Sequence, residues 1–212
     1  MERPLYILRH GETLFNVQHK TQGFCDSPLT ARGVEQCRIA GRMLRGRGLV
    51  FDGLFCSTSE RCSDTLELAL EAGWGEIFPY VRMRGLKEMN FGAFEAKDQF
   101  LERFPHGDFY KAYGGESEDE ALGRYVEALH ACMGAGHETT LVVSHGGVNA
   151  MLFHATVRDP APGTVAFGNC ICYHYGYDDE REGMERFRWI ETLVPDFSSL
   201  DAPGLPPQVS WR

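Results

Sequence analysis

The segment LYILRHGET, residues 5–13, joins an apolar run directly to a basic, glycine-containing turn. Leu5–Leu8 has the length and composition of a short buried strand. A helix is predicted over residues 30–47, where apolar residues recur at helical spacing after Thr30, a residue suited to cap a helix. A buried strand followed by a helix is the repeating unit of parallel sheets, so the chain begins as an α/β fold does.

The same order of strand and helix recurs further along the chain. Val50–Cys56 and Thr139–Val143 are predicted strands, and helices are predicted after them over residues 60–72 and 147–155. Ser57-Thr58-Ser59 supplies capping residues between the first of these strands and its helix. The sequence therefore predicts an α/β fold, a three-layer α/β/α sandwich around a mostly parallel central sheet. Its further predicted elements are a strand over 77–81, a helix over 118–133 and two late β-rich runs over 165–175 and 186–193.

The length of 212 residues favours one domain with an insertion. We expect a single domain over residues 1–195. Residues 91–116 interrupt the alternation with seven aromatic residues and mixed charges, and we interpret them as an insertion or lid. Residues 196–212 form a proline-rich C-terminal tail, an irregular strap or a loose end.

Composition limits the partners and the compartment. Lys+Arg of 21 against Asp+Glu of 30 gives a net charge of −9, which argues against nucleic acid and against anionic membranes as partners. Seven cysteines without a repeated paired spacing indicate reduced thiols, and the start of the chain lacks the pattern of a signal peptide, so we expect a cytoplasmic protein. Cys170-x-Cys172-x-His174 is half of a metal motif without a second half, and we assign no metal site. A homodimer remains open.

Basic residues follow three of the predicted strands. Arg9 and His10 follow the first, Arg61 comes shortly after the second, and His145 follows the last strand of the parallel set. Ligands of open α/β sheets bind outside the carboxyl ends of the strands, so these four side chains are predicted to lie around one binding crevice. In an acidic protein such a cluster needs an anion, and arginine matches phosphate oxygens with two hydrogen bonds.

A histidine in that pocket has a chemical role open to it. Neighbouring arginines disfavour its protonation, so His10 should stay neutral and nucleophilic near pH 7. Attack on phosphorus would then make His10 a phosphohistidine.

The chain resembles the histidine phosphatase superfamily, also called phosphoglycerate mutase-like, and within it the phosphatase branch. The resemblance covers roughly residues 4–195 and rests on ordered motifs along the whole of that range. These are Leu8-Arg9-His10-Gly11-Glu12-Thr13, Asn16, Gln22-Gly23, Asp26-Ser27-Pro28-Leu29-Thr30, Gly33, Gln36, Ser57, Arg61, Thr65, Leu86, Glu88, Phe91-Gly92, Gly115-Glu116-Ser117 and Ser144-His145-Gly146.

The resemblance implies a role for each matching residue. His10 is implied to be the nucleophile, and Glu88 the general acid that protonates the leaving oxygen. To act in this way Glu88 must be protonated at neutral pH, which partial burial or a nearby leaving oxygen can arrange by raising its pKa. Arg9, Arg61 and His145 are implied to hold the phosphoryl group, and the implied substrate-binding residues are Asn16, Gln22, Gly23 and Gly146.

One motif departs from the family pattern. The family often has Gly-x-Trp-Glu-Gly after the acid, whereas this chain has Gly92-Ala93-Phe94-Glu95-Ala96. This departure concerns the backbone geometry of the acid loop, the segment around Glu88 at residues 85–96.

The resemblance and the residues together predict a metal-independent phosphomonoester hydrolase of the histidine acid phosphatase type. It would use no cofactor and act on a small phosphorylated metabolite through a phosphohistidine. A bisphosphoglycerate-dependent phosphoglycerate mutase is the alternative, but it would carry an Asn-Lys pair after the acid and a later Arg-Arg pair, and Ala96-Lys97-Asp98 and the residues beyond supply neither. A catalytically silent phospho-ligand binder would usually have lost His10, Arg61, Glu88 or His145, and all four are present.

Overall fold

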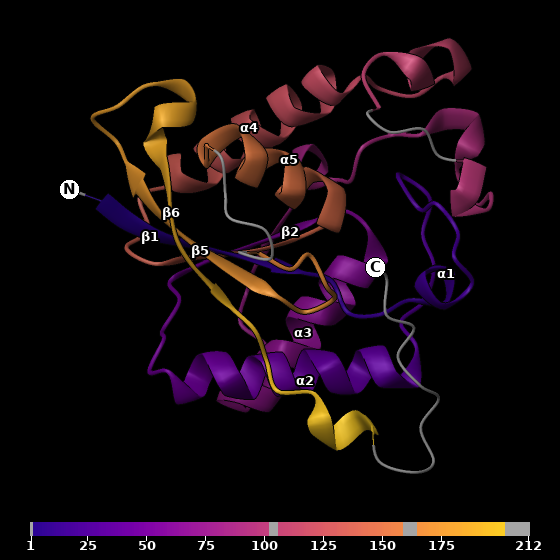
Figure 1. The fold of residues 1–212 in the computed structure, drawn as a ribbon. Coiled ribbons are helices and arrows are strands. Elements are labelled where there is room, and N and C mark those ends of the chain that lie inside the picture. The colour runs from indigo at the N-terminus through magenta and orange to yellow at the C-terminus, as the bar shows by residue number, and fades with distance from the viewer. Residues whose placement is uncertain (1, 102–105, 159–164, 202–212) are drawn as a thin grey trace.

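The structure is a computed structural model, and it describes residues 2–101, 106–158 and 165–201. At its centre lies one sheet of six strands (Figure 1). The strands are β1 (Glu2–Arg9), β2 (Gly53–Ser57), β3 (Val81–Met83), β4 (Thr140–Ser144), β5 (Cys172–Asp178) and β6 (Phe187–Leu193). Their order across the sheet is β3-β2-β4-β1-β5-β6, with parallel pairing among β1 to β4 and antiparallel pairing on both sides of β5.

Helices cover both faces of this sheet. Figure 1 shows α2 and α3 on one face and α4 and α5 on the other, which makes the predicted three-layer α/β/α architecture. The α-helices are α1 (Leu14–Val17), α2 (Ala31–Gly46), α3 (Glu60–Trp74), α4 (Glu118–Gly134) and α5 (Gly146–Thr156). Short 3-10 helices lie at Arg84–Leu86, Gly92–Phe94, Gln99–Leu101, Phe109–Tyr113, Gly183–Arg186 and Ser198–Asp201.

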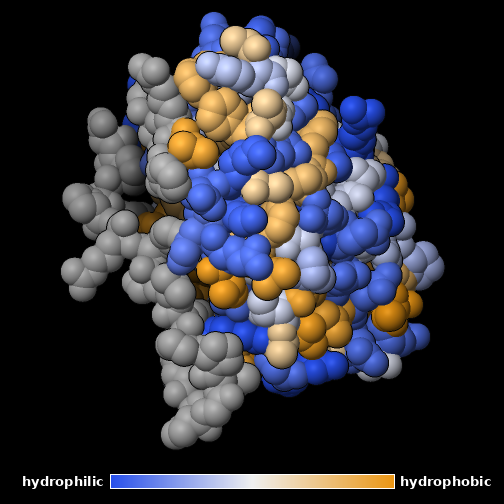
Figure 2. Space-filling model, turned by 90° about the vertical axis from the view of Figure 1, so that its right-hand side faces the viewer, coloured by the Kyte–Doolittle hydropathy of each residue, from blue (hydrophilic) through white to orange (hydrophobic). Residues whose placement is uncertain are grey.

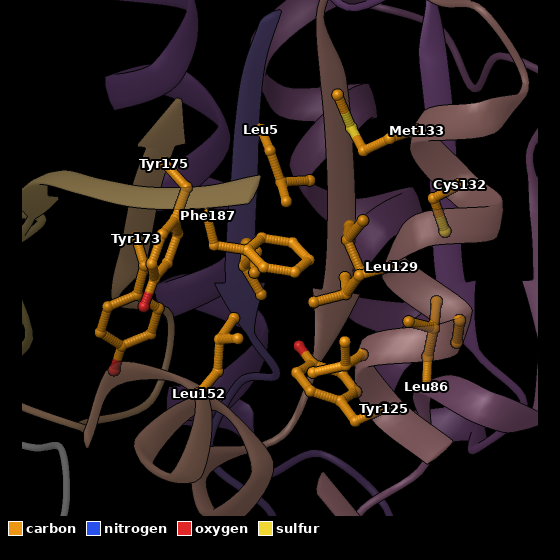
Figure 3. Packing of buried hydrophobic residues seen from close by; sticks show 14 of the residues in the cluster. Leu5, Leu86, Tyr125, Leu129, Cys132, Met133, Leu152, Tyr173, Tyr175 and Phe187 are labelled. Atoms are coloured by element: carbon orange, nitrogen blue, oxygen red, sulfur yellow. The ribbon is translucent and has the colours of Figure 1, made fainter. Parts of the chain in front are cut away.

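Alternating side chains of β1 supply both halves of the core. Leu5 and Ile7 lie in the cluster beneath α4 and α5, whereas Tyr6 and Leu8 lie in the cluster beneath α2 and α3. This is the period-two alternation that a strand buried on both faces requires. Figure 3 shows the first cluster, in which Leu129 of α4 and side chains of the sheet point toward one another. The apolar run in β1 therefore anchors the two outer layers to one sheet.

Residues 91–116 carry a small core of their own. Phe91 and Tyr110 are buried with Met89 and Ala121, and Phe94 and Phe109 pack against them. Tyr113 is 46% exposed at the edge of this group. Residues 102–105 of the predicted lid lie outside the described residues.

The C-terminal region is described only as far as residue 201, so most of the predicted tail lies outside the described residues. Within the described part, Leu200 is buried and its carbonyl oxygen accepts a hydrogen bond of 3.0 Å from Arg32 Nη1 on α2. This contact attaches residues 198–201 to the α2 layer.

The ends of several elements differ from the sequence prediction. The strand predicted over residues 77–81 forms instead at Val81–Met83, and the run predicted from residue 165 becomes a strand only at Cys172. Ser59 is the N-cap of α3 but makes no capping hydrogen bond with its side chain. No helix of the described residues is long and apolar enough to cross a membrane.

Figure 2 shows the face that lies on the right-hand side of Figure 1. On the coloured part of this face, apolar residues form separate patches among hydrophilic ones. The large apolar side chains that remain exposed among the described residues, with 37–65% of their surface accessible, are spread along the chain. They are Leu14, Val17, Val50, Ile77, Val81, Leu101, Tyr113, Ile190 and Val194.

Candidate active site

The carboxyl ends of β1, β2 and β4 bring the predicted basic residues together. Arg9 is in register with Ser144, and the backbone N–H of His10 donates to the Ser144 carbonyl oxygen over 3.0 Å. The rings of His10 and His145 consequently lie with their centroids 5.4 Å apart. The parallel pairing of β1 with β4 thus places one histidine beside the other, as the sequence predicted.

One hydrogen bond determines the tautomer of His10. Its Nδ1 lies 2.8 Å from the carbonyl oxygen of Gly11, and a carbonyl can only accept, so Nδ1 carries the proton. The other ring nitrogen, Nε2, then holds a lone pair. His10 is almost entirely buried, at 3% exposure. Burial lowers the pKa of His10 well below 6.5, and the positive charges of Arg61 and Arg9 lower it further. The ring is therefore neutral at neutral pH and carries a lone pair on Nε2.

Arg61 is a buried cation held by four hydrogen bonds. It is 1% exposed; Nη1 donates to the Cys25 carbonyl oxygen and to Asp26 Oδ1, both at 2.8 Å, and Nη2 donates to the Gly23 carbonyl oxygen at 2.9 Å. Its Nη2 also donates to Nδ1 of His145 at 3.0 Å, because a guanidinium has no acceptor. Arg61 on α3 therefore joins the loop at residues 23–26 to the histidine at the start of α5.

His145 is neutral in this arrangement. Since Nδ1 accepts from Arg61, the proton sits on Nε2, which donates to Ser57 Oγ at 2.8 Å. Burial lowers the pKa of His145 well below 6.5, and Arg61 is the largest of the charges that lower it further. Ser57 was predicted as a capping residue for the next helix, but its hydroxyl oxygen accepts a hydrogen bond from Nε2–H of His145.

Arg9 lies against the first residue of α5. A Cβ atom added at Gly146 would lie 3.0 Å from the Cζ and Nε atoms of Arg9, so a larger residue there would require the guanidinium to shift. Arg9 Nη1 donates to the Phe167 carbonyl oxygen. The Nε atoms of Arg9 and Arg61 are both buried and have no hydrogen-bond partner among the described residues. Two buried donors of cationic side chains are thus left for an anion.

The predicted acid, Glu88, is bound to the start of the same helix. Its Oε2 accepts from the backbone N–H of Gly147 at 2.8 Å, and Oε1 accepts from those of Val148 and Met89, each at 3.0 Å. A Cβ at Gly147 would lie 2.6 Å from Oε1. The glycine pair 146–147 therefore allows Arg9 and Glu88 to approach one helix end, and Gly147 is a site residue that the sequence analysis did not name.

A second ion pair fixes the backbone that carries Glu88. Arg124 of α4 donates to the carbonyl oxygens of Gly85, Lys87 and Glu88 at 2.8–3.0 Å, and both oxygens of Glu116 accept from it at 2.8 Å. Three carbonyls held by one guanidinium leave the acid loop little freedom to shift. Glu116 was part of the motif list, whereas Arg124 was missed because nothing in its local sequence indicates a partner in the acid loop.

Gly23 lies in a loop that is bonded to the acid loop through Glu95. Oε1 of Glu95 accepts from the N–H of Phe24, and Oε2 accepts from that of Cys25, both at 2.7 Å. A Cβ at Gly23, whose φ is +58°, would come within 2.3 Å of the same carboxylate. Gln22 beside it is buried, and its Oε1 has no hydrogen-bond partner among the described residues. Glu95 thus joins the loop at residues 23–25 to the loop that follows Glu88.

Asn16 is oriented by donors on its amide oxygen. Oδ1 accepts from the backbone N–H and the hydroxyl of Thr13, both at 3.0 Å, and from Nδ2 of Asn169 at 3.3 Å. Asn169 Nδ2 also donates to the His10 carbonyl oxygen at 3.0 Å. With Oδ1 so engaged, the Nδ2 group of Asn16 is the one left to bind a ligand. Asn169 lies just before β5, 159 residues from His10 and 153 from Asn16. It was not predicted because its partners are so far away in sequence.

Where the family motif often ends in glycine, this chain has Ala96 in a backbone conformation that favours glycine. Ala96 has φ of 61°, in the left-handed region that favours glycine. Its N–H nevertheless donates to the Thr21 carbonyl oxygen at 2.8 Å, and Glu95 keeps its contacts. The acid loop therefore keeps the glycine-like conformation although an alanine occupies the position.

The predicted site residues thus converge on one cluster. Among the described residues, no group of three or more His, Cys, Asp or Glu side chains is arranged to hold a metal ion. All seven cysteines lie in the described part and are free thiols.

The family model of the histidine phosphatase superfamily (branch 1) matches residues 5–190. A broad-specificity phosphatase of Saccharomyces cerevisiae is 31% identical over 156 residues, which are 70% of this chain and 67% of that protein. A 2,3-bisphosphoglycerate-dependent phosphoglycerate mutase of Xanthobacter autotrophicus is 32% identical over 159 residues, 68% of this chain and 76% of that protein. The solved structure of YhfR from Bacillus stearothermophilus has 26% identity and a TM-score of 0.73, covering 88% of this chain and 94% of that one.

Proposed function

Because the chain belongs to the histidine phosphatase superfamily, we propose that it is a phosphomonoester hydrolase that forms a phosphohistidine on His10 and needs no metal. The observation that carries the proposal is the free Nε2 lone pair of a buried, neutral His10 beside two buried and unpartnered arginine donors. This set contains a nucleophile and the cations for the group it attacks.

Binding of the phosphate is assigned to fixed donors. The Nε atoms of Arg9 and Arg61 gain a partner when an anion enters, and the Nδ2 group of Asn16 adds a neutral donor. A buried donor without a partner costs on the order of 1–3 kcal/mol, so ligand binding recovers a penalty that the free enzyme carries.

In the first chemical step Nε2 of His10 attacks phosphorus. A bond from Nε2 to phosphorus forms while the bond to the ester oxygen breaks, and the electron pair of that bond leaves with the oxygen. Charge spreads over the three remaining phosphoryl oxygens, where preorganised cations stabilise the transition state. In the resulting phosphohistidine, Nδ1 keeps its proton because the Gly11 carbonyl oxygen continues to accept it.

The leaving oxygen needs a proton, and we assign it to Oε2 of Glu88. A carboxyl group has about four lone-pair positions. Oε1 uses two of them for Met89 and Val148, whereas Oε2 uses one for Gly147. Oε2 is therefore the oxygen with a position free for a proton. In the second step the Glu88 carboxylate takes a proton from water, and the resulting hydroxide oxygen attacks phosphorus to release phosphate and neutral His10.

Water rather than a second hydroxyl is proposed as the acceptor. A mutase must hold its dephosphorylated intermediate by the carboxylate, which calls for dedicated cations near the acid loop. In the segment 91–116, Lys111 instead forms an ion pair with Glu120, with 2.6 Å between Nζ and Oε1. The mutase relative nevertheless makes isomerisation the second candidate. As substrates we propose small phosphorylated metabolites of the cytoplasm, since free cysteines are typical of a reducing compartment.

The proposal is tested with a panel of phosphomonoesters assayed for released phosphate, with and without excess EDTA. We expect turnover of at least one ester that EDTA leaves unchanged. Loss of activity in EDTA with recovery on adding a divalent ion would contradict the metal-independent route, and no turnover of any ester would favour a phospho-ligand binder. Conversion of 3-phosphoglycerate to 2-phosphoglycerate in the presence of 2,3-bisphosphoglycerate, with little phosphate released, would favour the mutase.

A further inference from the structure

Two cysteines lie in contact directly behind the proposed nucleophile. Cys37 on α2 and Cys170 in the turn before β5 have their Sγ atoms 3.8 Å apart, and both side chains are fully buried. That separation is van der Waals contact between two sulfur atoms, so no other group lies between them. They are 133 residues apart in sequence, and only the packing of α2 against the sheet brings them together.

This pair is connected to the His10 loop on both sides. The backbone N–H of Cys170 donates to the carbonyl oxygens of Arg9 at 3.1 Å and of His10 at 3.3 Å. On the other side, a Cβ built on Gly11 would lie 2.6 Å from Cys37 Sγ, so the sulfur is packed against the Gly11 backbone. Movement of either sulfur therefore acts on the segment that carries Nε2 and its hydrogen-bond acceptor.

We propose that Cys37 and Cys170 are a modification site, a dithiol that hydrogen peroxide or an organic peroxide oxidises to a disulfide, and that this disulfide switches off the His10 site. The sulfur of Cys37 attacks one peroxide oxygen to give a sulfenic acid, and water or an alcohol leaves. The sulfur of Cys170 then displaces water from that sulfenic acid. Overall, two thiols and one hydrogen peroxide give one disulfide and two waters.

Cys37 is the better placed of the two to react first. Its Sγ accepts a hydrogen bond from the Cys170 thiol, and its own thiol donates to Thr65 Oγ1 at 3.5 Å. Burial opposes ionisation of Cys37, but the hydrogen bond from Cys170 contributes to a lowered pKa of Cys37, whereas burial raises the pKa of Cys170. A thiolate is the reactive form of cysteine, so the first oxidation is assigned to Cys37.

Closing the disulfide must disturb the site. The Sγ atoms have to approach from 3.8 Å to the bond length of about 2.0 Å, a displacement of about 1.8 Å in a close-packed core. Cys170 has φ of 56°, a conformation with little room for a further backbone change in a residue with a side chain. The displacement is therefore passed to the Arg9, His10 and Gly11 backbone, which moves Nε2 away from the phosphoryl group.

The experiment oxidises the intact protein with hydrogen peroxide, maps peptides without reduction and assays phosphate release before and after dithiothreitol. We expect a linked peptide joining residues 33–38 to residues 159–181, at least tenfold lower kcat/KM, and recovery on reduction. Because the second peptide contains both Cys170 and Cys172, Cys172→Ala is the matched control. In Cys172→Ala the linked peptide and the inactivation should both persist. In Cys37→Ala and in Cys170→Ala both should be absent.

Three results would overturn the proposal. One is inactivation that proceeds unchanged in Cys37→Ala, the second is a link to a cysteine other than this pair, and the third is a linked protein with full activity. If the variants fail to fold, the linked peptide of the wild-type chain and its activity still decide the question. The linked peptide is detected whether or not the protein is a phosphatase, so failure of the proposed function is distinguishable from failure of this one.

Discussion

Arg61 donates a hydrogen bond from Nη2 to Nδ1 of His145 at 3.0 Å, and this bond keeps the proton of His145 on Nε2. The same guanidinium holds the carbonyl oxygens of Gly23 and Cys25 and the carboxylate of Asp26. One cation therefore sets the tautomer of His145 and holds the loop at residues 23–26.

Arg61→Lys should lower kcat/KM by on the order of 10²–10³-fold, since a single ammonium group cannot replace a fork of donors that supports the loop and the phosphoryl group at once. Steady-state kinetics on the best substrate of the panel measures the loss. The matched control is Arg82→Lys, which changes an arginine with 36% of its side chain exposed, paired with Glu60, and should leave kcat/KM within about twofold. A loss of equal size in both variants would contradict the role of Arg61.

Glu88→Gln should affect substrates according to their leaving groups. An alkyl phosphate needs a proton on its leaving oxygen, so its kcat/KM, which reports the step that forms the phosphohistidine, should fall by about 10²–10⁴-fold, whereas kcat/KM for p-nitrophenyl phosphate, with an acidic leaving group, should fall by less than about tenfold. The amide preserves most of the shape of the side chain, which separates proton transfer from packing. Equal losses on both substrates would assign Glu88 to structure instead of acid catalysis.

Protein stability should fall as the pH is lowered through the histidine range. Burial lowers the pKa of His10 and of His145 well below 6.5 in the folded protein. Below pH 6.5 the unfolded chain therefore binds protons that the folded chain does not, and the free energy of unfolding decreases with falling pH. Each such histidine contributes a slope of up to about 1.4 kcal/mol per pH unit between its folded and unfolded pKa values.

Denaturant unfolding at several pH values between 7.5 and 5 measures this slope. His106, His130 and His174 also have lowered pKa values and contribute to the slope of the wild type. The informative quantity is therefore the difference between the wild type and His10→Gln or His145→Gln, each of which should have a shallower slope. Identical slopes in all three proteins would show that neither histidine is held neutral by folding.

Ala96→Gly should stabilise the protein by about 0.5–1 kcal/mol, because glycine adopts the φ of 61° observed at this position without steric cost. Urea unfolding gives the difference directly. Ala93→Gly is the matched control in the same loop, where φ is not positive and the change should destabilise by a similar amount. Destabilisation by Ala96→Gly would mean that the loop adopts another conformation.

The sequence predicted those parts of the fold and site that depend on local patterns. Short apolar runs in Leu5–Leu8 and Thr139–Val143 indicate buried strands, and the rule that ligands bind beyond parallel strand ends locates His10 and His145. The start of β5 at Cys172 was harder to predict, because pairing with β1 decides where this strand begins and amino-acid composition does not. Strand ends are set by partners as well as by propensity.

The supporting residues of the site could not be predicted in the same way. Asn169 and Arg124 act through hydrogen bonds to backbone carbonyls far away in sequence, and no local pattern encodes such partners. Ser57 shows the opposite case, since a serine between a strand and a helix predicts a cap, but the neighbouring histidine binds its hydroxyl instead. Long-range partners are properties of the assembled sheet.

The measurement that tests the central claim most directly is the trapping of the phosphorylated enzyme. The protein is mixed rapidly with p-nitrophenyl phosphate, quenched at alkaline pH, where phosphohistidine survives, and digested for mass spectrometry. We predict one added phosphoryl group, located on His10, with no such adduct in His10→Ala and a kcat in that variant lower by more than about 10³-fold. A phosphoryl group on another residue, or a His10→Ala enzyme that still turns over at a wild-type rate, would contradict the account.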